Sequence, residues 1–201
     1  MNFLAHCRLA HPGDGFVAGG ILGDFVKGGI PESLPPELRA GVRLHRRIDS
    51  FSNRLPAIRG SVGRFPPALR RAAPVLLDIV ADHCLARSWS RHGIGDLADF
   101  TSRVYAAVGR YGDWVPPRGR PFVERMVETD LLARYTDSAV VQRAMEHVLR
   151  RLKLAGLGDQ LADVLDEALP ALARDFDDYF PQLDAFAQAE RTMATRWAAT
   201  T

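Results

Sequence analysis

The stretch that decides the fold is Pro35-Pro-Glu-Leu-Arg-Ala-Gly-Val-Arg-Leu-His-Arg-Arg-Ile-Asp49. Two prolines suit the first turn of a helix, where the backbone N–H has no helical partner, so the segment predicts a helix that runs to about Leu55. The same helical period of apolar residues dominates the rest of the 201-residue chain, and no segment shows the alternation of a half-buried strand. The sequence therefore predicts an all-α protein.

Turn signals and prolines separate the other helices. We predict them over residues 3–10, 16–27, 67–91, 97–108, 121–135, 139–154, 159–174 and 175–197, the last with a bend at Pro181. Gly19 and Gly20 lower the helix propensity of their segment and indicate close approach of another backbone. The loop 112–121 is the least regular region and is either a lid or a plain connection. Because there is no repeat, linker or low-complexity tract, residues 1–201 are predicted to form a single-domain helical bundle.

The composition is typical of a soluble globular protein. Apolar residues make up 47% of the chain and charged residues 25%. No apolar run approaches the roughly 18 residues that a membrane span needs. The segment Met1-Asn-Phe-Leu-Ala-His6 lacks the basic start and apolar stretch of a secretory signal. Cys7 and Cys84 have apolar neighbours and are interpreted as buried free thiols, with a disulfide as the alternative. We expect a cytoplasmic protein.

Charge is distributed unevenly along the chain. Between residues 39 and 71 nine arginines accompany one acid, Asp49, whereas between Asp159 and Asp184 eight acids accompany Arg174 alone. An arginine-rich face attracts anionic partners such as nucleic acids, phosphorylated ligands or acidic proteins. The alternative is an ordinary solvated surface, since the chain has only two lysines and uses arginine for most of its positive charge.

Two pairs of polar residues have the spacing of one helix face. His45 and Asp49 are four residues apart, and so are Asp78 and Asp82, with His83 beside the second pair. On a helix, side chains at this spacing emerge next to one another, with Cβ atoms about 5–6 Å apart. Each pair therefore offers imidazole or carboxylate groups that can converge on a shared ligand inside a bundle.

Two further polar groups lie in apolar segments. Asp24 belongs to Ile21-Leu-Gly-Asp-Phe-Val26, and His6 follows Phe-Leu-Ala; an unpaired charge is costly in such a setting. Imidazole and carboxylate groups without thiolate favour manganese, magnesium, iron or zinc, and such an ion neutralises phosphoryl oxygens and acidifies a coordinated water. Arg46 and Arg47 add guanidinium groups that suit a phosphate. Spacing thus indicates a metal and phosphate site within residues 1–92, the alternative being a set of caps, ion pairs and core histidines.

Several motifs follow one another in order: Met1-Asn-Phe-Leu-Ala-His6, Gly20-Ile-Leu-Gly-Asp-Phe-Val-Lys-Gly28, Ala40-Gly-Val-Arg-Leu-His-Arg-Arg-Ile-Asp49, Ala73-Pro74, Leu77-Asp78, Asp82-His83 and Trp89. In this order they resemble the bacterial acyl carrier protein phosphodiesterases, from Met1 to about His92. The resemblance implies hydrolysis of the phosphodiester that joins 4′-phosphopantetheine to a serine of holo acyl carrier protein. It also implies an all-helical, HD-domain-like fold and Mn²⁺ as cofactor, with Mg²⁺ or another divalent metal as the alternative.

The chain departs from the HD pattern at one place. No histidine is followed by aspartate, and in Ile21-Leu-Gly-Asp24 the position of the histidine is taken by Gly23. The resemblance implies that His6, Asp24 and Asp82 are metal ligands. The missing imidazole would then come from His45 or His83.

The resemblance also implies roles for the remaining polar residues. Arg46 or Arg47 would stabilise the charge of the transition state, and Asp49 or Asp78 would orient the ligands or carry a proton. Acyl carrier proteins are acidic, so the arginine-rich segment would dock the holo carrier protein through Arg39, Arg43, Arg54, Arg59, Arg64, Arg70 and Arg71.

Two other functions are consistent with the same residues. One is an HD-type phosphohydrolase that acts on nucleotides or on a guanosine alarmone, which would share the metal site without needing a long basic face. The other is a non-enzymatic helical module that binds an acidic partner through its arginines. Nucleic-acid binding is disfavoured, because the acidic C-terminal segment offsets the arginines and no reader motif is present.

Overall fold

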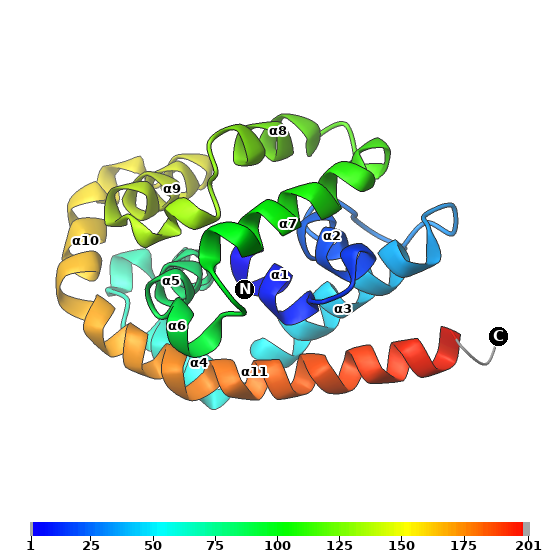
Figure 1. Ribbon diagram of the computed structural model, residues 1–201. Helices are drawn as coiled ribbons and strands as arrows, with labels where there is room; N and C mark the ends of the chain where they lie inside the picture. Colours follow the sequence, from blue (N-terminus) through cyan, green and yellow to red (C-terminus); the bar gives the residue numbers. More distant parts are fainter. Residues whose placement is uncertain (1, 199–201) are drawn as a thin grey trace.

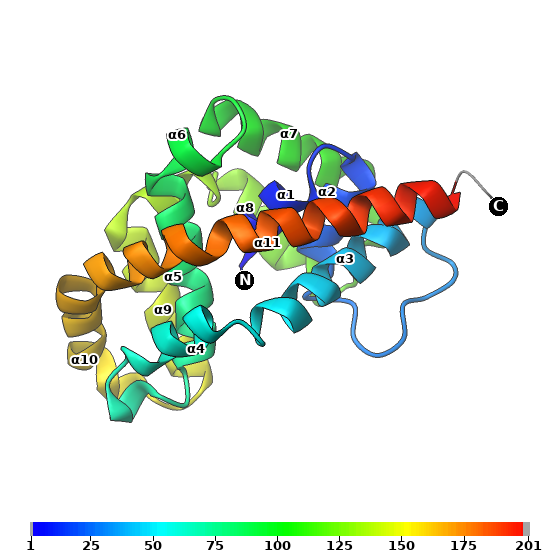
Figure 2. The ribbon, with the colours of Figure 1, turned by 90° about the horizontal axis from the view of Figure 1, so that it is seen from below.

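The computed structural model describes residues 2–198. Over that range the regular elements are all helices and no strand is present, which confirms the predicted fold class (Figures 1 and 2). The helices are α1 (Phe3–Ala10), α2 (Asp14–Leu22), α3 (Pro36–Ser52), α4 (Pro56–Gly63), α5 (Ala73–Arg87), α6 (Trp89–His92), α7 (Leu97–Arg110), α8 (Arg120–Glu128), α9 (Ser138–Arg151), α10 (Gly158–Asp163) and α11 (Leu169–Ala198). Short 3₁₀ turns, and one π turn at Val164–Ala168, connect some of them.

Several predicted boundaries are wrong, and one of them concerns a candidate ligand. α2 ends at Leu22, so Asp24 lies in the turn after the helix. The helix predicted over residues 121–135 ends at Glu128, because Asp130 has a positive φ of 47° that a helix does not allow. No boundary occurs near residue 174; α11 instead starts at Leu169 and continues through Pro181.

Glycines let the backbones of α2 and α3 approach closely. A Cβ atom added to Gly19 would lie 2.4 Å from the carbonyl carbon of Gly41, and one added to Gly41 would lie 2.4 Å from the carbonyl oxygen of Gly15. Gly20 packs in the same way on the backbone of His6, with a hypothetical Cβ 3.3 Å from its carbonyl group. The predicted close approach at Gly19 and Gly20 is confirmed, and it brings α1, α2 and α3 together.

One continuous apolar core joins these three helices to α5 and α11. Nearly every residue of α5 from Leu76 to Ala86 is buried, which makes α5 the central helix. Figure 2 shows α11 crossing in front of α3 and α5, and the aromatic residues Phe176, Tyr179 and Phe180 of α11 are each about 1% exposed. The C-terminal half of the chain therefore closes the core of the N-terminal half.

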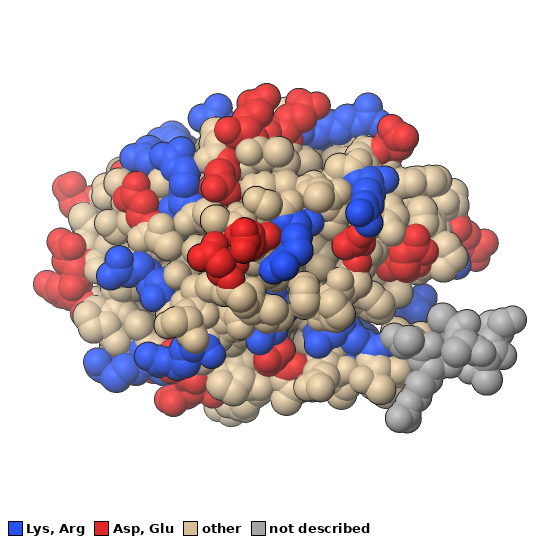
Figure 3. Space-filling view, in the orientation of Figure 1, with Lys and Arg blue, Asp and Glu red and all other residues tan. Residues whose placement is uncertain are grey.

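Part of the charge asymmetry is neutralised within the molecule. Arg64 donates from Nε and Nη2 to the two carboxylate oxygens of Asp175, at 2.7 and 2.8 Å, and lowers the pKa of that carboxyl group. Arg8 likewise makes two bonds to Asp184, at 3.1 and 2.9 Å. Both signs of charge are interspersed on the face shown in Figure 3. The acidic C-terminal segment thus holds some of the arginines in place.

Two further predictions concern the cysteines, expected to be buried free thiols, and the lack of an apolar run long enough to span a membrane. Cys7 and Cys84 are buried and free, and burial raises the pKa of the Cys84 thiol to about 12. No helix within residues 2–198 combines the length and the apolar character needed to cross a membrane.

Candidate metal centre

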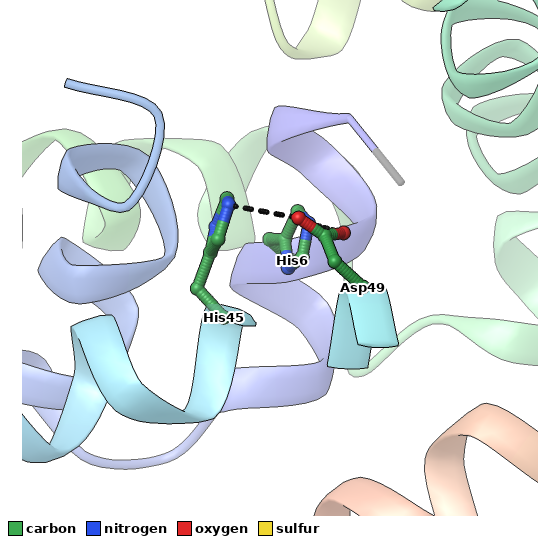
Figure 4. Close-up of side chains that lie close together, drawn as sticks. All are labelled: His6, His45 and Asp49. Atoms are coloured by element: carbon green, nitrogen blue, oxygen red, sulfur yellow. Dashed lines mark hydrogen bonds and ion pairs between the residues drawn. The ribbon is translucent and has the colours of Figure 1, made fainter. Parts of the chain in front are cut away.

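His6 on α1 and two residues of α3, His45 and Asp49, point toward one another (Figure 4). One potential ligand atom from each lies within 4.8 Å of the others. Nε2 of His6 is 3.1 Å from one carboxylate oxygen of Asp49, and Nε2 of His45 is 3.3 Å from the other. Two imidazole edges thus converge on one carboxylate. The predicted pairing of His45 and Asp49 on a single helix face is what places this carboxylate between them.

The backbone of α2 fixes the orientation of His45. Nδ1 of His45 lies 2.9 Å from the carbonyl oxygen of Gly20, a distance and partner that require Nδ1 to carry the proton. When the ring is neutral, Nε2 then carries a lone pair that a metal ion can use; when the ring is protonated, Nε2–H donates to the carboxylate of Asp49. Metal-binding histidines in proteins are held in the same way, with one ring nitrogen bound to a carbonyl and the other free to ligate.

His6 is held in its neutral form by burial. Its side chain is 0% exposed, and burial together with the neighbouring His45 lowers its pKa to about 3, although Asp49 opposes the shift. The rings of His6 and His45 stack with centroids 3.8 Å apart and planes 17° from parallel. A neutral imidazole is the form that binds a metal, so His6 is ready to ligate at physiological pH.

Asp49 is held in its ionised form. Burial of the carboxyl group acts to raise its pKa, but hydrogen bonding to His45 and His6 outweighs burial and lowers the pKa below its usual range. The group therefore offers one anionic oxygen ligand and two neutral nitrogen ligands. This donor set fits Mn²⁺, Fe²⁺ or Zn²⁺, and it fits Mg²⁺ less well because magnesium prefers oxygen ligands.

Gly23 makes room for the ring of His45. A Cβ atom at Gly23 would lie 2.3 Å from Cγ of His45, so no other residue fits beneath the ring in its present position. The imidazole of His45 therefore lies against Gly23, the position at which the HD pattern would have its histidine. Of the two residues suggested as the source of the missing imidazole, His45 is the one whose ring lies against Gly23, and its role as a ligand stays a prediction.

Asp24 and Asp78 approach the same group from two sides. Asp24 lines a hollow of about 290 Å³ with His45, Arg46 and Asp49. Asp78 lines a cavity of about 440 Å³ on the other side, where Asp49 again forms part of the wall. Burial is the main cause that raises the pKa of both Asp24 and Asp78. Each is therefore suited to hold a proton beside His6, His45 and Asp49, the three candidate ligands called the metal group below.

Asp82 and His83 make other contacts. The two carboxylate oxygens of Asp82 accept the backbone N–H groups of Leu4 and Ala5, each at 2.9 Å, and so cap the start of α1. Burial raises the pKa of Asp82 to about 7, against the two N–H bonds. Nδ1 of His83 donates to the carbonyl oxygen of Tyr135 at 2.6 Å. Neither side chain belongs to the group of His6, His45 and Asp49. Asp82 instead holds the first turn of α1, the helix that carries His6.

Replacing Asp82 with alanine is expected to lower the free energy of unfolding by about 2 kcal/mol, because two buried N–H groups lose their acceptor. Urea unfolding followed by circular dichroism measures this change. Asp113, which is exposed, provides the control: Asp113→Ala should change the free energy by less than about 0.5 kcal/mol. Equal stability of the two variants would contradict the capping role of Asp82.

The two arginines of the His45-Arg-Arg-Ile-Asp49 segment point in different directions. Arg46 donates to the carbonyl oxygens of Gly28 and Val26, at 2.8 and 2.7 Å, and lines the smaller hollow. Arg47 is exposed and donates to Glu190 of α11 at 2.7 Å. The structure therefore brings Arg46 to the metal group and directs Arg47 to the C-terminal helix.

The loop 112–121 packs beside Asp24. Arg118 donates to the carbonyl oxygen of Phe25, and a Cβ atom at Gly119 would lie 2.7 Å from the ring of Phe25. The ring of Phe25 lies 6.4 Å from that of Phe3 and 5.8 Å from that of Phe122. The loop and this aromatic cluster support the turn that carries Asp24.

Sequence reasoning missed Tyr179 of α11, which reaches the larger cavity from about 100 residues beyond Asp78. It also missed the carbonyl group of Gly20 as the partner of His45. Neither contact leaves a signal in the local sequence pattern.

Comparisons with known proteins agree with the motifs. A family model described as "Acyl carrier protein phosphodiesterase" matches residues 1–183. The acyl carrier protein phosphodiesterases of Escherichia coli K12 (DH10B) and of Escherichia coli O157:H7 (EC4115) are 36% identical to this chain over 193 residues, which cover 95% of it and 98% of each relative. No solved structure matches, so the HD-domain likeness stays a prediction. The family match and the two relatives span nearly the whole sequence, and the chain belongs to the acyl carrier protein phosphodiesterase family.

Proposed function

We propose that the chain hydrolyses the phosphodiester bond of holo acyl carrier protein and releases 4′-phosphopantetheine. The observation that carries this proposal is the pair of imidazole nitrogens that converge on the Asp49 carboxylate, in a chain of this family. His6, His45 and Asp49 would hold a divalent metal, for which we propose Mn²⁺. When bound, such an ion stabilises the negative charge that develops on the phosphoryl oxygens.

The reaction forms one phosphorus–oxygen bond to water and breaks the bond to the serine oxygen. The departing serine oxygen needs a proton. We assign this proton to the carboxyl group of Asp24, whose pKa is raised by burial and which lines the smaller hollow together with Asp49. Asp78, whose pKa is raised by the same cause, lines the larger cavity and would orient the attacking water and accept the proton that the water loses.

Arg46 would act as a positioning residue. Its guanidinium group holds the carbonyl groups of Val26 and Gly28, so it fixes the loop that forms one edge of the hollow. Lys27 in that loop brings a second positive charge to the same hollow. These two cations would offset the charge of the phosphodiester before reaction.

The test is a mass measurement on the carrier protein. The purified protein is stripped of metal, reloaded with Mn²⁺ and incubated with holo acyl carrier protein. We expect the carrier to lose the mass of phosphopantetheine, and we expect no loss with the metal-free protein. Hydrolysis of a nucleotide panel with an unchanged carrier mass would overturn the proposal in favour of a nucleotide phosphohydrolase.

The docking face is predicted to follow α3. Arg39, Arg43 and Arg46 are spaced by four and three residues, so they lie on one helix face that leads to the smaller hollow. Within the described part of the chain, Arg39 and Arg43 make no ion pair, whereas Arg64 is held by Asp175. An acidic carrier protein would bind this stripe by charge complementarity.

Replacing Arg39 and Arg43 together with alanine is expected to raise the KM for holo carrier protein about 10-fold and to leave kcat within about twofold, because the arginines bind the carrier away from the reacting bond. Steady-state kinetics at two salt concentrations measures this. The rise should shrink at high salt, where exposed charges are screened. Arg64→Ala is the control and should leave KM nearly unchanged; an equal effect of Arg64→Ala would contradict the assignment of the docking stripe to α3.

A further inference from the structure

The larger cavity beside the metal group is a built pocket. Its volume is about 440 Å³, within the range of about 300–1,000 Å³ for small-molecule sites. Its walls come from the consecutive helices α3, α4 and α5 and from α11, which is distant in the sequence. It opens on the reaction centre, because Asp49 and Asp78 form part of its wall.

The lining is mixed in a way that suits a flexible chain with amide groups. One part of the wall is apolar and consists of Ile58, Val62, Pro74, Leu77 and Ala81. Another part is polar and includes Ser52, Asn53 and Arg59. A pantetheine arm has the matching chemistry, since it carries a branched apolar segment, two amide groups and a thiol.

Tyr179 brings a hydroxyl group to the apolar part of the cavity. Its side chain is 1% exposed and forms part of the cavity wall. Burial raises the pKa of this hydroxyl group well above its usual value, so it remains a donor. Buried tyrosine hydroxyl groups nearly always have a partner. A ligand amide in the cavity would supply one.

The smaller hollow differs in size and charge. Its volume is about 290 Å³, and Lys27, Gly28 and Arg46 form its edge. Asp49 belongs to both walls, so the metal group lies between the two spaces. A phosphodiester bound at the metal group would direct its two substituents into different spaces.

We infer that the cavity lined by Tyr179, Leu77 and Ala81 binds the pantetheine arm, while the carrier protein sits over the hollow at Lys27 and Arg46. This inference rests on the proposed function and adds the orientation of the substrate. Tyr179 is a specificity-determining residue that donates its hydroxyl hydrogen to an amide oxygen of the arm. Ala81 is the small residue that leaves room for it.

Two substitutions test the inference. Tyr179→Phe removes only the hydroxyl oxygen, and Ala81→Leu adds bulk to the cavity wall. We expect each to raise the KM for holo carrier protein at least about 10-fold and to weaken the binding of free 4′-phosphopantetheine by a similar factor, as measured by calorimetry on the Mn²⁺-loaded protein. Hydrolysis of bis(p-nitrophenyl) phosphate, which has no arm, should stay within about twofold of wild type.

Stability separates a binding role from a structural one. If the hydroxyl group of Tyr179 serves ligand binding, Tyr179→Phe should leave the melting temperature unchanged, whereas a structural hydrogen bond would be lost with a fall in the melting temperature. The matched control is Tyr111→Phe. The hydroxyl group of Tyr111 donates to Glu37 at 2.9 Å, and Tyr111 does not line the cavity, so this variant should leave both KM and phosphopantetheine binding unchanged.

The outcomes distinguish this inference from the proposed function. Wild-type binding of free phosphopantetheine by both variants would overturn the assignment of the cavity, even if the wild-type protein hydrolyses the carrier. If the wild-type protein leaves the carrier intact, the proposed function fails, while loss of phosphopantetheine binding in the variants would still support the cavity.

Discussion

Replacing Asp49 with asparagine is expected to reduce turnover of holo carrier protein at least about 100-fold, because losing even an outer partner of a metal ligand costs about 10- to 100-fold. Asparagine keeps the size of the side chain and removes the negative charge on which Nε2 of His6 and Nε2 of His45 converge. The two imidazoles then face a neutral amide, and the ligand group loses its only anionic member. We expect the affinity for Mn²⁺, measured by calorimetry on the metal-free protein, to fall in parallel.

Two comparisons make this result specific. Asp99 is exposed on α7, so Asp99→Asn should retain wild-type turnover and metal affinity. Asp82→Asn tests the ligand role that the family resemblance implies for that residue. A fall in metal affinity in Asp82→Asn with none in Asp49→Asn would transfer the ligand role from the group of Figure 4 to Asp82. Far-ultraviolet circular dichroism checks that each variant keeps its helices.

Local sequence rules predicted the elements that place the candidate site, and tertiary contacts decided the rest. The spacing of His45 and Asp49 predicted that both would lie on one helix face, and they do. Proline predicted correctly where α3 begins, and α9 begins within one residue of its predicted start, with Asp137 accepting the N–H of Ala139. These features depend only on residues within one or two turns of each other.

The contacts that complete the group cross long distances in the sequence. His6 meets Asp49 over 43 positions, and Asp82 caps α1 over 77 and 78 positions. Spacing could not rank Asp49 above Asp82 as a ligand, because both are carboxylates four residues from another polar group. Boundary errors have a similar origin: the end of α2 at Leu22 places Gly23 under the His45 ring, a packing relation between different helices.

Gly23→Ala is expected to reduce turnover about 100-fold, because a displacement of about 1 Å at a reaction centre can cost that much. The added methyl carbon would lie 2.3 Å from Cγ of His45, so the imidazole must move away from Asp49. The backbone itself does not require glycine, since φ at Gly23 is −51° and ψ is −36°, values open to any residue. The need for glycine is therefore a need for the His45 ring to occupy this space.

A matched control and a double variant isolate this cause. Gly60 lies in α4 with nothing within 4 Å of its hypothetical Cβ, so Gly60→Ala should leave turnover unchanged. In a His45→Ala background the steric conflict is absent. In the His45→Ala protein, adding Gly23→Ala should change turnover by less than about threefold. It should also raise stability slightly, because alanine has a higher helix propensity than glycine. Additive losses from the two substitutions would instead mean that Gly23 acts independently of His45, because sites that share no contact contribute separately.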